Sequence, residues 1–303
     1  MFFRGILSRA FGGIRSMAID YEKLKNWKFD ETRQKITPKD VILYALGVGL
    51  GENPTDENEL RFVYEENLLA LPSMASVLGY PGNWLRNPSS GVNYLKLVNA
   101  GNAFTNHNPI PTKGTLVGQA KVEDIIDKGE GRGALVSAIR DVYHEETGDL
   151  ICTIRTTTYC RADGGFGGPI GPVPEPQAIP DSEPELTCVL TTIRQSALIY
   201  RLSGDYNPLH ADPNIAKKAG FNRPIAHGLL TYGVVCHALV KSLCNYDPLK
   251  FKSMEGRFSA PVFPGDTIRT NMWRDGENVI FQATVPEREN VVVLNNGKAT
   301  VTS

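Results

Sequence analysis

The sequence predicts a protein of the α+β class in which a curved antiparallel sheet surrounds one central helix, and in which this arrangement occurs twice. Three observations support the prediction. Each half of the chain contains a run of strand-like segments, and each half contains a segment with the composition of a buried helix. Two short motifs also recur 151–156 positions apart, at 44–47 and 200–203 and at 111–115 and 264–267. Offsets this consistent indicate a duplicated fold.

The predicted strands of the two halves follow the matching turns at residues 111–115 and 264–267. They are rich in β-branched residues and are divided by polar or glycine-containing turns, which is typical of strand meanders. The predicted strands are 115–126, 134–143 and 150–160 in the first half, and 267–274, 278–285 and 291–302 in the second.

The central helix is predicted most clearly in the second half, over residues 228–243. This segment is apolar on nearly every face. A helix without a polar side must be enclosed, so a sheet wrapped around it is the expected architecture. The weaker counterpart in the first half is 68–78, where we expect Pro72 near the first turn.

Residues 164–185 are predicted to connect the halves, because they hold six prolines between Pro169 and Pro184. Such a segment continues neither a helix nor a central strand. The predicted units are therefore 20–163, a degenerate repeat, and 186–303, a catalytic repeat. Residues 1–19 carry three arginines and no acid, which is typical of a mitochondrial presequence but also compatible with an inert extension.

The composition excludes several classes of function. With 32 basic and 33 acidic residues, the net charge of −1 gives no support for binding nucleic acid. The five cysteines form no C-x-x-C pair, which argues against a disulfide framework or a zinc knuckle. No apolar run approaches the roughly 18 residues of a membrane span.

The segment 200–210, followed by 224–228, carries the chemistry. Asp205 and His210 lie five positions apart in a sequence rich in turn-forming residues, so a compact loop can bring both to one wall of a cavity. A carboxylate and an imidazole form an acid–base pair that works near neutral pH. The alternative is that these residues only form turns and that Asp212 and Pro213 start a helix at 214–219.

The same segment resembles the signature of the MaoC-like (R)-specific 2-enoyl-CoA hydratases, also called hydratase 2. Further similarity lies at residues 44–49, 62–65, 127–129, 164–168 and 257–258, and it resembles the two-repeat hydratase 2 domain of peroxisomal multifunctional enzyme type 2. The resemblance implies a double hot-dog fold. It also implies that the first repeat has lost the catalytic loop, as the sequence after Gly47 indicates, and that this widens the acyl tunnel.

The implied activity is reversible syn hydration of a trans-2-enoyl-CoA to a (3R)-3-hydroxyacyl-CoA in fatty acid metabolism. Asp205 and His210 would hold the water, and Asn207 would orient Asp205 or the water. The N–H of Gly228, at the start of the buried helix, would bind the thioester oxygen, although this glycine could also serve only close packing. We expect no metal and no cofactor, since CoA is part of the substrate.

Other site residues are carried over from the resemblance. Those expected to contact the substrate or its CoA are Tyr206, Pro208, Leu209, Phe258, Lys128, Asn99 and Ala100. Glu65 corresponds to a glutamate considered important in the family, but the region that follows it is shorter here. Asn99 and Ala100 stand where the family has a His-Gly pair.

Two other functions remain open at this stage, a hot-dog acyl-CoA thioesterase and a non-catalytic acyl-CoA-binding module. A zinc site made by His210, His227 and His237 is not expected, because their spacing of 17 and 10 matches no compact site. A homodimer is one expectation for the assembly. The arginine-rich first residues favour mitochondria, whereas the family resemblance favours peroxisomes.

Overall fold

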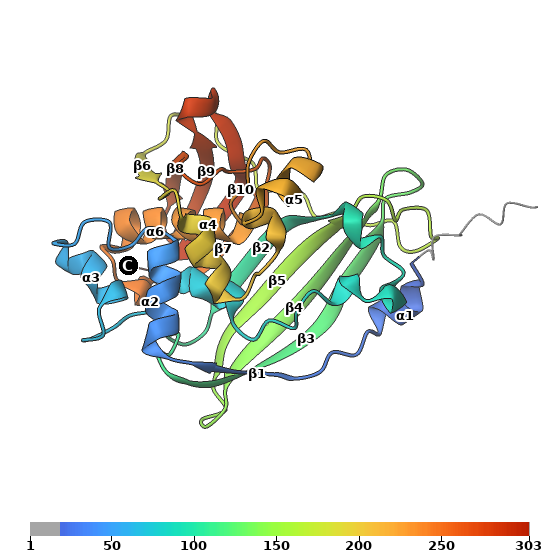
Figure 1. The fold of residues 1–303 in the computed structure, drawn as a ribbon, viewed down its shortest axis with the longest axis horizontal. Coiled ribbons are helices and arrows are strands. Elements are labelled where there is room, and N and C mark those ends of the chain that lie inside the picture. The colour runs from blue at the N-terminus through green and yellow to red at the C-terminus, as the bar shows by residue number, and fades with distance from the viewer. Residues whose placement is uncertain (1–18, 303) are drawn as a thin grey trace, which may run out of the picture.

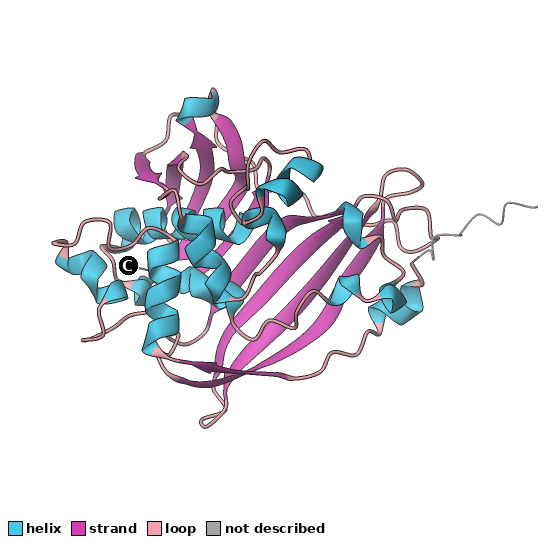
Figure 2. Ribbon diagram, viewed as in Figure 1, coloured by secondary structure: helices cyan, strands magenta, loops and turns pink. Residues whose placement is uncertain are grey.

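The computed structural model describes residues 19–302, and in this part of the chain ten strands form one antiparallel sheet (Figures 1 and 2). The strands are β1 (Thr32–Ile36), β2 (Leu97–Asn106), β3 (Gly114–Asp127), β4 (Ala134–His144), β5 (Leu150–Cys160), β6 (Leu186–Thr191), β7 (Phe251–Phe258), β8 (Thr267–Asp275), β9 (Asn278–Val285) and β10 (Val291–Val301). The six predicted strands are confirmed, each within one residue of its predicted bounds. Strands β1, β2, β6 and β7 were not predicted.

The order of the strands is symmetric about the centre of the sheet. It runs β1-β3-β4-β5-β2-β7-β10-β9-β8-β6, so each strand of the first half has an equivalent in the second. The halves join where β2 pairs with β7, from Gly101 opposite Arg257 to Thr105 opposite Ser253. The predicted duplication is confirmed, and the two predicted sheets meet edge to edge as one continuous sheet.

Six α-helices accompany the sheet in the described residues. They are α1 (Tyr21–Lys25), α2 (Pro38–Gly47), α3 (Glu57–Val63), α4 (Ser196–Tyr200), α5 (Pro213–Lys218) and α6 (Gly228–Cys244). The predicted central helix of the second half is α6, which has 17 residues and is buried along most of its length. Helices α2 and α4 are repeat equivalents and pack together, with the Tyr44 and Tyr200 rings 5.7 Å apart.

The central helix predicted at 68–78 is wrong as an α-helix. Only residues Pro72–Val77 are helical there, and they form a 3₁₀ helix, η1, with Pro72 in its first turn as predicted. Polar side chains hold this segment in place: the Tyr44 hydroxyl donates to Ser73 Oγ at 2.9 Å, and Asn102 Nδ2 donates to Ser76 Oγ at 2.9 Å. Proline limits the helix at its start, and hydroxyls bonded to neighbouring elements compete with a longer helix.

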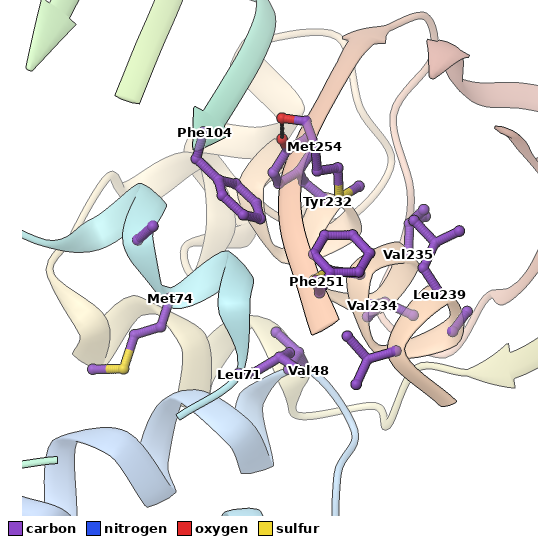
Figure 3. Close-up of a cluster of buried hydrophobic side chains, with 14 of the residues drawn as sticks. Val48, Leu71, Met74, Phe104, Tyr232, Val234, Val235, Leu239, Phe251 and Met254 are labelled. Carbon is purple, nitrogen blue, oxygen red and sulfur yellow. Dashed lines mark hydrogen bonds between the residues drawn. The ribbon is translucent and has the colours of Figure 1, made fainter. Parts of the chain in front are cut away.

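One hydrophobic core extends across both halves. Side chains from η1, β2, β7 and α6 meet in it, and Figure 3 shows Phe104 and Tyr232 side by side. Their rings lie 6.0 Å apart, nearly perpendicular, and the Tyr232 hydroxyl donates to the Met254 carbonyl at 2.6 Å. Because this core crosses the β2–β7 boundary, the halves pack as one body.

The predicted connector contains neither helix nor strand over residues 164–185. It is tied to both halves by hydrogen bonds. The Asp127 carboxylate accepts the N–H groups of Gly165 and Gly167, at 2.7 and 2.9 Å, and Trp273 Nε1 donates to the Ser182 carbonyl at 2.8 Å. The boundaries 20–163 and 186–303 stay a prediction, and the predicted extension 1–19 lies almost wholly outside the described residues.

None of the helices in residues 19–302 is long and apolar enough to cross a membrane.

Candidate active site

The loop between α4 and α5 is built from consecutive turns that its sequence dictates. Gly204 has φ +120°, a conformation that residues with a Cβ rarely adopt. Asp205 Oδ1 then accepts the backbone N–H of Asn207 at 3.1 Å, and Asn207 Oδ1 accepts the N–H of Leu209 at 3.2 Å. Asn207 thereby caps the 3₁₀ helix η6 (Pro208–His210). The loop thus serves turn formation as well as placing Asp205 and His210.

The loop brings Asp205 and His210 together with a third residue, His227. One potential ligand atom from each of the three lies within 4.8 Å of the others. The rings of His210 and His227 lie against each other, with centroids 3.8 Å apart and a tilt of 32°, and both side chains are buried. The predicted pair therefore shares one site, at the N-terminal end of α6.

His227 holds the loop against the start of α6. Its Nε2 lies 3.1 Å from the backbone carbonyl of Asp205, and a carbonyl only accepts, so Nε2 carries the hydrogen. His227 lies within the predicted signature, but no catalytic or positioning role was predicted for it. Its position directly before the helix that begins at Gly228 was the signal for a positioning residue.

The surroundings of His210 keep its imidazole neutral. Burial lowers the pKa of His210, and the Ile225 carbonyl and the charge of Asp205 offset this only in part. Its Nδ1 lies 2.9 Å from the Ile225 carbonyl and must donate, which leaves Nε2 as a free acceptor. Burial also lowers the pKa of His227, and the two adjacent imidazoles disfavour protonation of each other. A neutral base therefore stands beside the Asp205 carboxylate.

Gly228 is the first residue of α6, and its N–H takes part in no backbone hydrogen bond within the described residues. The Phe258 ring packs so closely against Gly228 that a Cβ at this position would lie 3.3 Å from the nearest ring carbon. The close packing and the free donor are thus both present. An unpaired N–H at the positive end of a helix dipole attracts a developing negative charge.

The other predicted contact residues occupy varied positions. Tyr206 is exposed, with the Arg201 guanidinium 5.0 Å from its ring centre, and Pro208 and Leu209 form η6. Lys128 directly follows β3, with its Nζ 4.9 Å from the centre of the Tyr159 ring. Asn99 and Ala100 lie at an irregularity in the pairing of β2 with β5. This end of β5 and β2 is also the end at which β7 reaches Phe258.

Glu65 is not brought into this group. It lies in an exposed turn after α3. Helix α3 contacts α6 through His237, nine residues after Gly228, which is about 13 Å along a helix. The structure therefore separates α3 from the group around Asp205.

A different glutamate, Glu59, is buried in α3. Its carboxylate accepts the Tyr246 hydroxyl and the Gly51 N–H, each at 2.9 Å, and it lies 3.7 Å from His237 Nε2 and 3.8 Å from Lys241 Nζ. Burial raises the pKa of Glu59, but contacts with His237 and Tyr246 outweigh it and lower the pKa to about 2. His237 thus belongs to this cluster, apart from His210 and His227.

Asp205, His210 and His227 form the one group among residues 19–302 whose donor atoms could converge on a metal ion. The hydrogen bonds to the Ile225 and Asp205 carbonyls already occupy one nitrogen of each histidine. The expectation of a metal-free site stays a prediction.

Two family models match the chain, and they divide it as the duplication does. Residues 35–162 match the MFE-2 hydratase 2 N-terminal domain, and residues 175–296 match the MaoC like domain. The resemblance found in the sequence is confirmed for both repeats.

Known proteins are similar over nearly the whole chain. The peroxisomal enoyl-CoA hydratase 2 of Arabidopsis thaliana is 39% identical over 88% of this chain and 91% of its own length. The crystal structure of a MaoC-like dehydratase from Phytophthora capsici is 33% identical, with a TM-score of 0.83 over 94% of this chain and 99% of that one.

A more distant structure supports the fold. A Mycobacterium tuberculosis protein with a double hotdog fold aligns with a TM-score of 0.54 at 14% identity, over 91% of this chain and 96% of that one. The predicted double hot-dog class is confirmed. The chain belongs to the enoyl-CoA hydratase 2 family, with a hydratase 2 N-terminal domain followed by a MaoC-like domain.

Proposed function

We propose that this protein catalyses the reversible addition of water to a trans-2-enoyl-CoA, giving a (3R)-3-hydroxyacyl-CoA in fatty acid metabolism of the β-oxidation type. One observation carries the proposal: the Asp205 carboxylate and the neutral His210 imidazole meet at the start of α6, where the Gly228 N–H makes no backbone hydrogen bond within residues 19–302. The name and similarity of the Arabidopsis relative support the same reaction.

The pair holds one water and moves two protons. His210 Nε2 accepts one O–H of the water, the Asp205 carboxylate accepts the other, and the water oxygen attacks C3 as Nε2 takes its proton. A proton returns from the pair to C2 on the same face. One water is consumed, its hydroxyl ends on C3 and its proton equivalent on C2, and the pair recovers its starting protonation. Addition from one side makes the reaction syn.

The Gly228 N–H stabilises the intermediate charge. As water attacks C3, negative charge develops on the thioester oxygen, and a donor fixed at the end of a 17-residue helix needs no rearrangement to bind it. Such a donor contributes on the order of 3 kcal/mol in other enzymes. Asn207 supports the same site through its backbone N–H, which fixes the Asp205 carboxylate.

The remaining residues are assigned to the CoA thioester. Tyr206, Pro208, Leu209 and Phe258 would line the path of the thioester and pantetheine, since they flank Asp205 or Gly228. Lys128, Asn99 and Ala100 would lie toward the nucleotide. No cofactor beyond the CoA of the substrate is part of this proposal.

A thioesterase is the alternative enzyme, because a carboxylate and a water can also attack a thioester carbon. Incubation with crotonyl-CoA separates the two activities. Hydration removes the absorbance of the conjugated enoyl thioester and releases no thiol. Release of free CoA would identify a thioesterase, and neither signal would indicate a binding module.

The location and the assembly are separate proposals. The peroxisomal name of the Arabidopsis relative supports a peroxisomal enzyme, and the arginines of the first residues support a mitochondrial one. A fluorescent fusion of the full chain, compared with one that lacks residues 1–17, distinguishes them: loss of mitochondrial signal on deletion supports a presequence. Light scattering tests the expected homodimer.

A further inference from the structure

Arg140 is a buried cation on the inner face of the first half. It lies on β4, opposite Ala120 of β3 and Ile154 of β5, and is only 6% exposed. Burial lowers the pKa of Arg140 to about 10, so its side chain remains charged at neutral pH. A buried charge is costly unless it is paired.

The protein supplies little to compensate this charge. One guanidinium nitrogen donates to the Ser76 carbonyl at 3.1 Å, and the Tyr80 ring centre lies 5.7 Å from the guanidinium carbon. The Nε of Arg140 has no hydrogen-bond partner among the described residues. None of the ion pairs in residues 19–302 includes Arg140. A guanidinium has five N–H donors in a planar fork that fits a carboxylate. The donors of Arg140 are therefore suited to bind an anion.

The position of Arg140 connects it to the candidate active site. Ser76, which accepts its hydrogen bond, is bonded through its hydroxyl to Asn102 of β2. Asn102 is opposite Gly256 of β7, two residues before Phe258, whose ring packs on Gly228. Two strand residues span about 7 Å. Tyr80 lies close enough to both charged groups for each to change its pKa. Burial and then the charge of Asp205 raise the pKa of Tyr80, and the charge of Arg140 lowers it.

Arg140 also lies where the two halves differ. In the second half the 17 residues of α6 cover the sheet, whereas in the first half the six-residue η1 and the loop that follows it stand in that place. In Figure 2, loops and short helical segments rather than a long helix cross the face of β3, β4 and β5 that is in view. An acyl chain that leaves the Asp205 site toward the first half would run toward Arg140.

We propose that Arg140 determines substrate specificity by binding a carboxylate carried on the acyl chain, so that this enzyme prefers ω-carboxylated trans-2-enoyl-CoA of one chain length. The inference rests on the proposed hydratase function. The ligand's carboxylate supplies the missing counter-ion and two acceptors for the fork. An unsubstituted acyl chain leaves the charge unpaired and must bury methylene groups against it.

The test compares kcat/KM for trans-2-enoyl-CoA substrates of six to twelve carbons with that for their ω-carboxylated counterparts. We expect the ratio of carboxylated to unsubstituted substrate to peak at one chain length in the unaltered protein. Arg140→Met should lower this ratio at least about 10-fold, because removing one partner of a buried charge pair is costly. The matched control is Arg155→Met, since Arg155 of the neighbouring strand pairs with Glu123 on the outer face.

A binding measurement covers the case in which Arg140→Met does not fold. Saturated ω-carboxyacyl-CoA should raise the Tm of the unaltered protein more than the acyl-CoA of equal length, through preferential binding to the folded state. Equal ratios in the unaltered protein and Arg140→Met, or equal Tm shifts for both ligands, would overturn the proposal. Hydration of unsubstituted substrates with equal ratios would refute only the role of Arg140, whereas no hydration of any substrate would refute the proposed function.

Discussion

Replacing Gly228 by proline removes the N–H to which we assign the thioester oxygen and disturbs little else. Proline is favoured in the first position of a helix, and its missing N–H costs no helical hydrogen bond there. His227 has φ −62° and ψ 142°, the extended conformation that a following proline requires. Loss of one such donor lowers kcat by about 10²–10³-fold, or about 3–4 kcal/mol, in other enzymes. We expect a loss of this size for Gly228→Pro.

Gly228→Ala is the matched control. It retains the N–H, and its Cβ meets the same Phe258 ring carbons, at 3.3–3.5 Å, as the Cβ of the proline. The assay is the initial rate of loss of enoyl-thioester absorbance, with the Tm of both variants measured to verify folding. Equal rates in the folded alanine and proline variants would refute the oxyanion role and leave only the packing role of this glycine.

Four further predictions follow from the same site and from the buried cluster on α3. Asp205→Asn and His210→Ala should each lower kcat at least about 10²-fold with little change in KM. The double variant should have nearly the same kcat as the single variants, because both residues act on one transition state. Additive losses in steady-state kinetics would argue against a joint role. Because burial lowers the pKa of His210, its neutral form persists below the usual pKa of about 6.5, so the acid limb of the kcat/KM profile should lie below that pH; a limb above it would contradict the assignment. His227→Phe keeps a ring against His210 but loses the donor to the Asp205 carbonyl. It should lower kcat about tenfold and the free energy of unfolding by about 1–3 kcal/mol. An unchanged kcat would refute the positioning role of His227. The pKa of Glu59 is about 2 in the folded protein, below that of an exposed glutamate, so its carboxylate contributes up to about 3 kcal/mol to the free energy of unfolding at neutral pH, and this contribution is lost as the pH falls from about 5 toward 2. In urea unfolding, the free energy of unfolding of Glu59→Gln should therefore differ from that of the unaltered protein at pH 7 and converge with it in acid. A difference that stays constant with pH would contradict this.

The parts of the fold that the sequence predicted well have a local signal. The meander strands alternate β-branched residues between polar turns, and α6 is apolar on nearly all faces, so both are evident from a short window. Strands β2 and β7 have no such pattern. Residues 97–106 contain three asparagines and a glycine, and they become a strand because both of their edges are paired in the centre of the sheet. Long-range pairing of this kind has no signal in the segment itself.

The central segment of the first half shows a different limit. Its apolar residues predicted a helix, but the side chains that shorten it belong to distant elements: Tyr44 lies on α2 and Asn102 on β2. The sequence shows the proline and the serines, not the partners that hold them. The contacts of residues 68–78 are therefore accessible only once the sheet is known.

The candidate site was predictable in part for the same reason. Asp205, Asn207 and His210 lie within six positions, so their turns and their family signature are read together. His227 joins them through a carbonyl 22 positions away, and Glu59 joins Tyr246 across 187 positions. Arg140 could not be singled out, because nothing in the sequence shows that it is buried without an acid.

The stereochemistry of the product tests the central claim most directly. The unaltered protein is incubated with trans-2-decenoyl-CoA, and the hydroxyacyl product is separated on a chiral phase. Membership of the enoyl-CoA hydratase 2 family predicts (3R)-3-hydroxydecanoyl-CoA as the product, and the pair of groups at the start of α6 predicts that it forms without release of free CoA. A (3S) or racemic product, or free CoA in place of the hydroxyacyl thioester, would contradict (R)-specific hydration by Asp205 and His210.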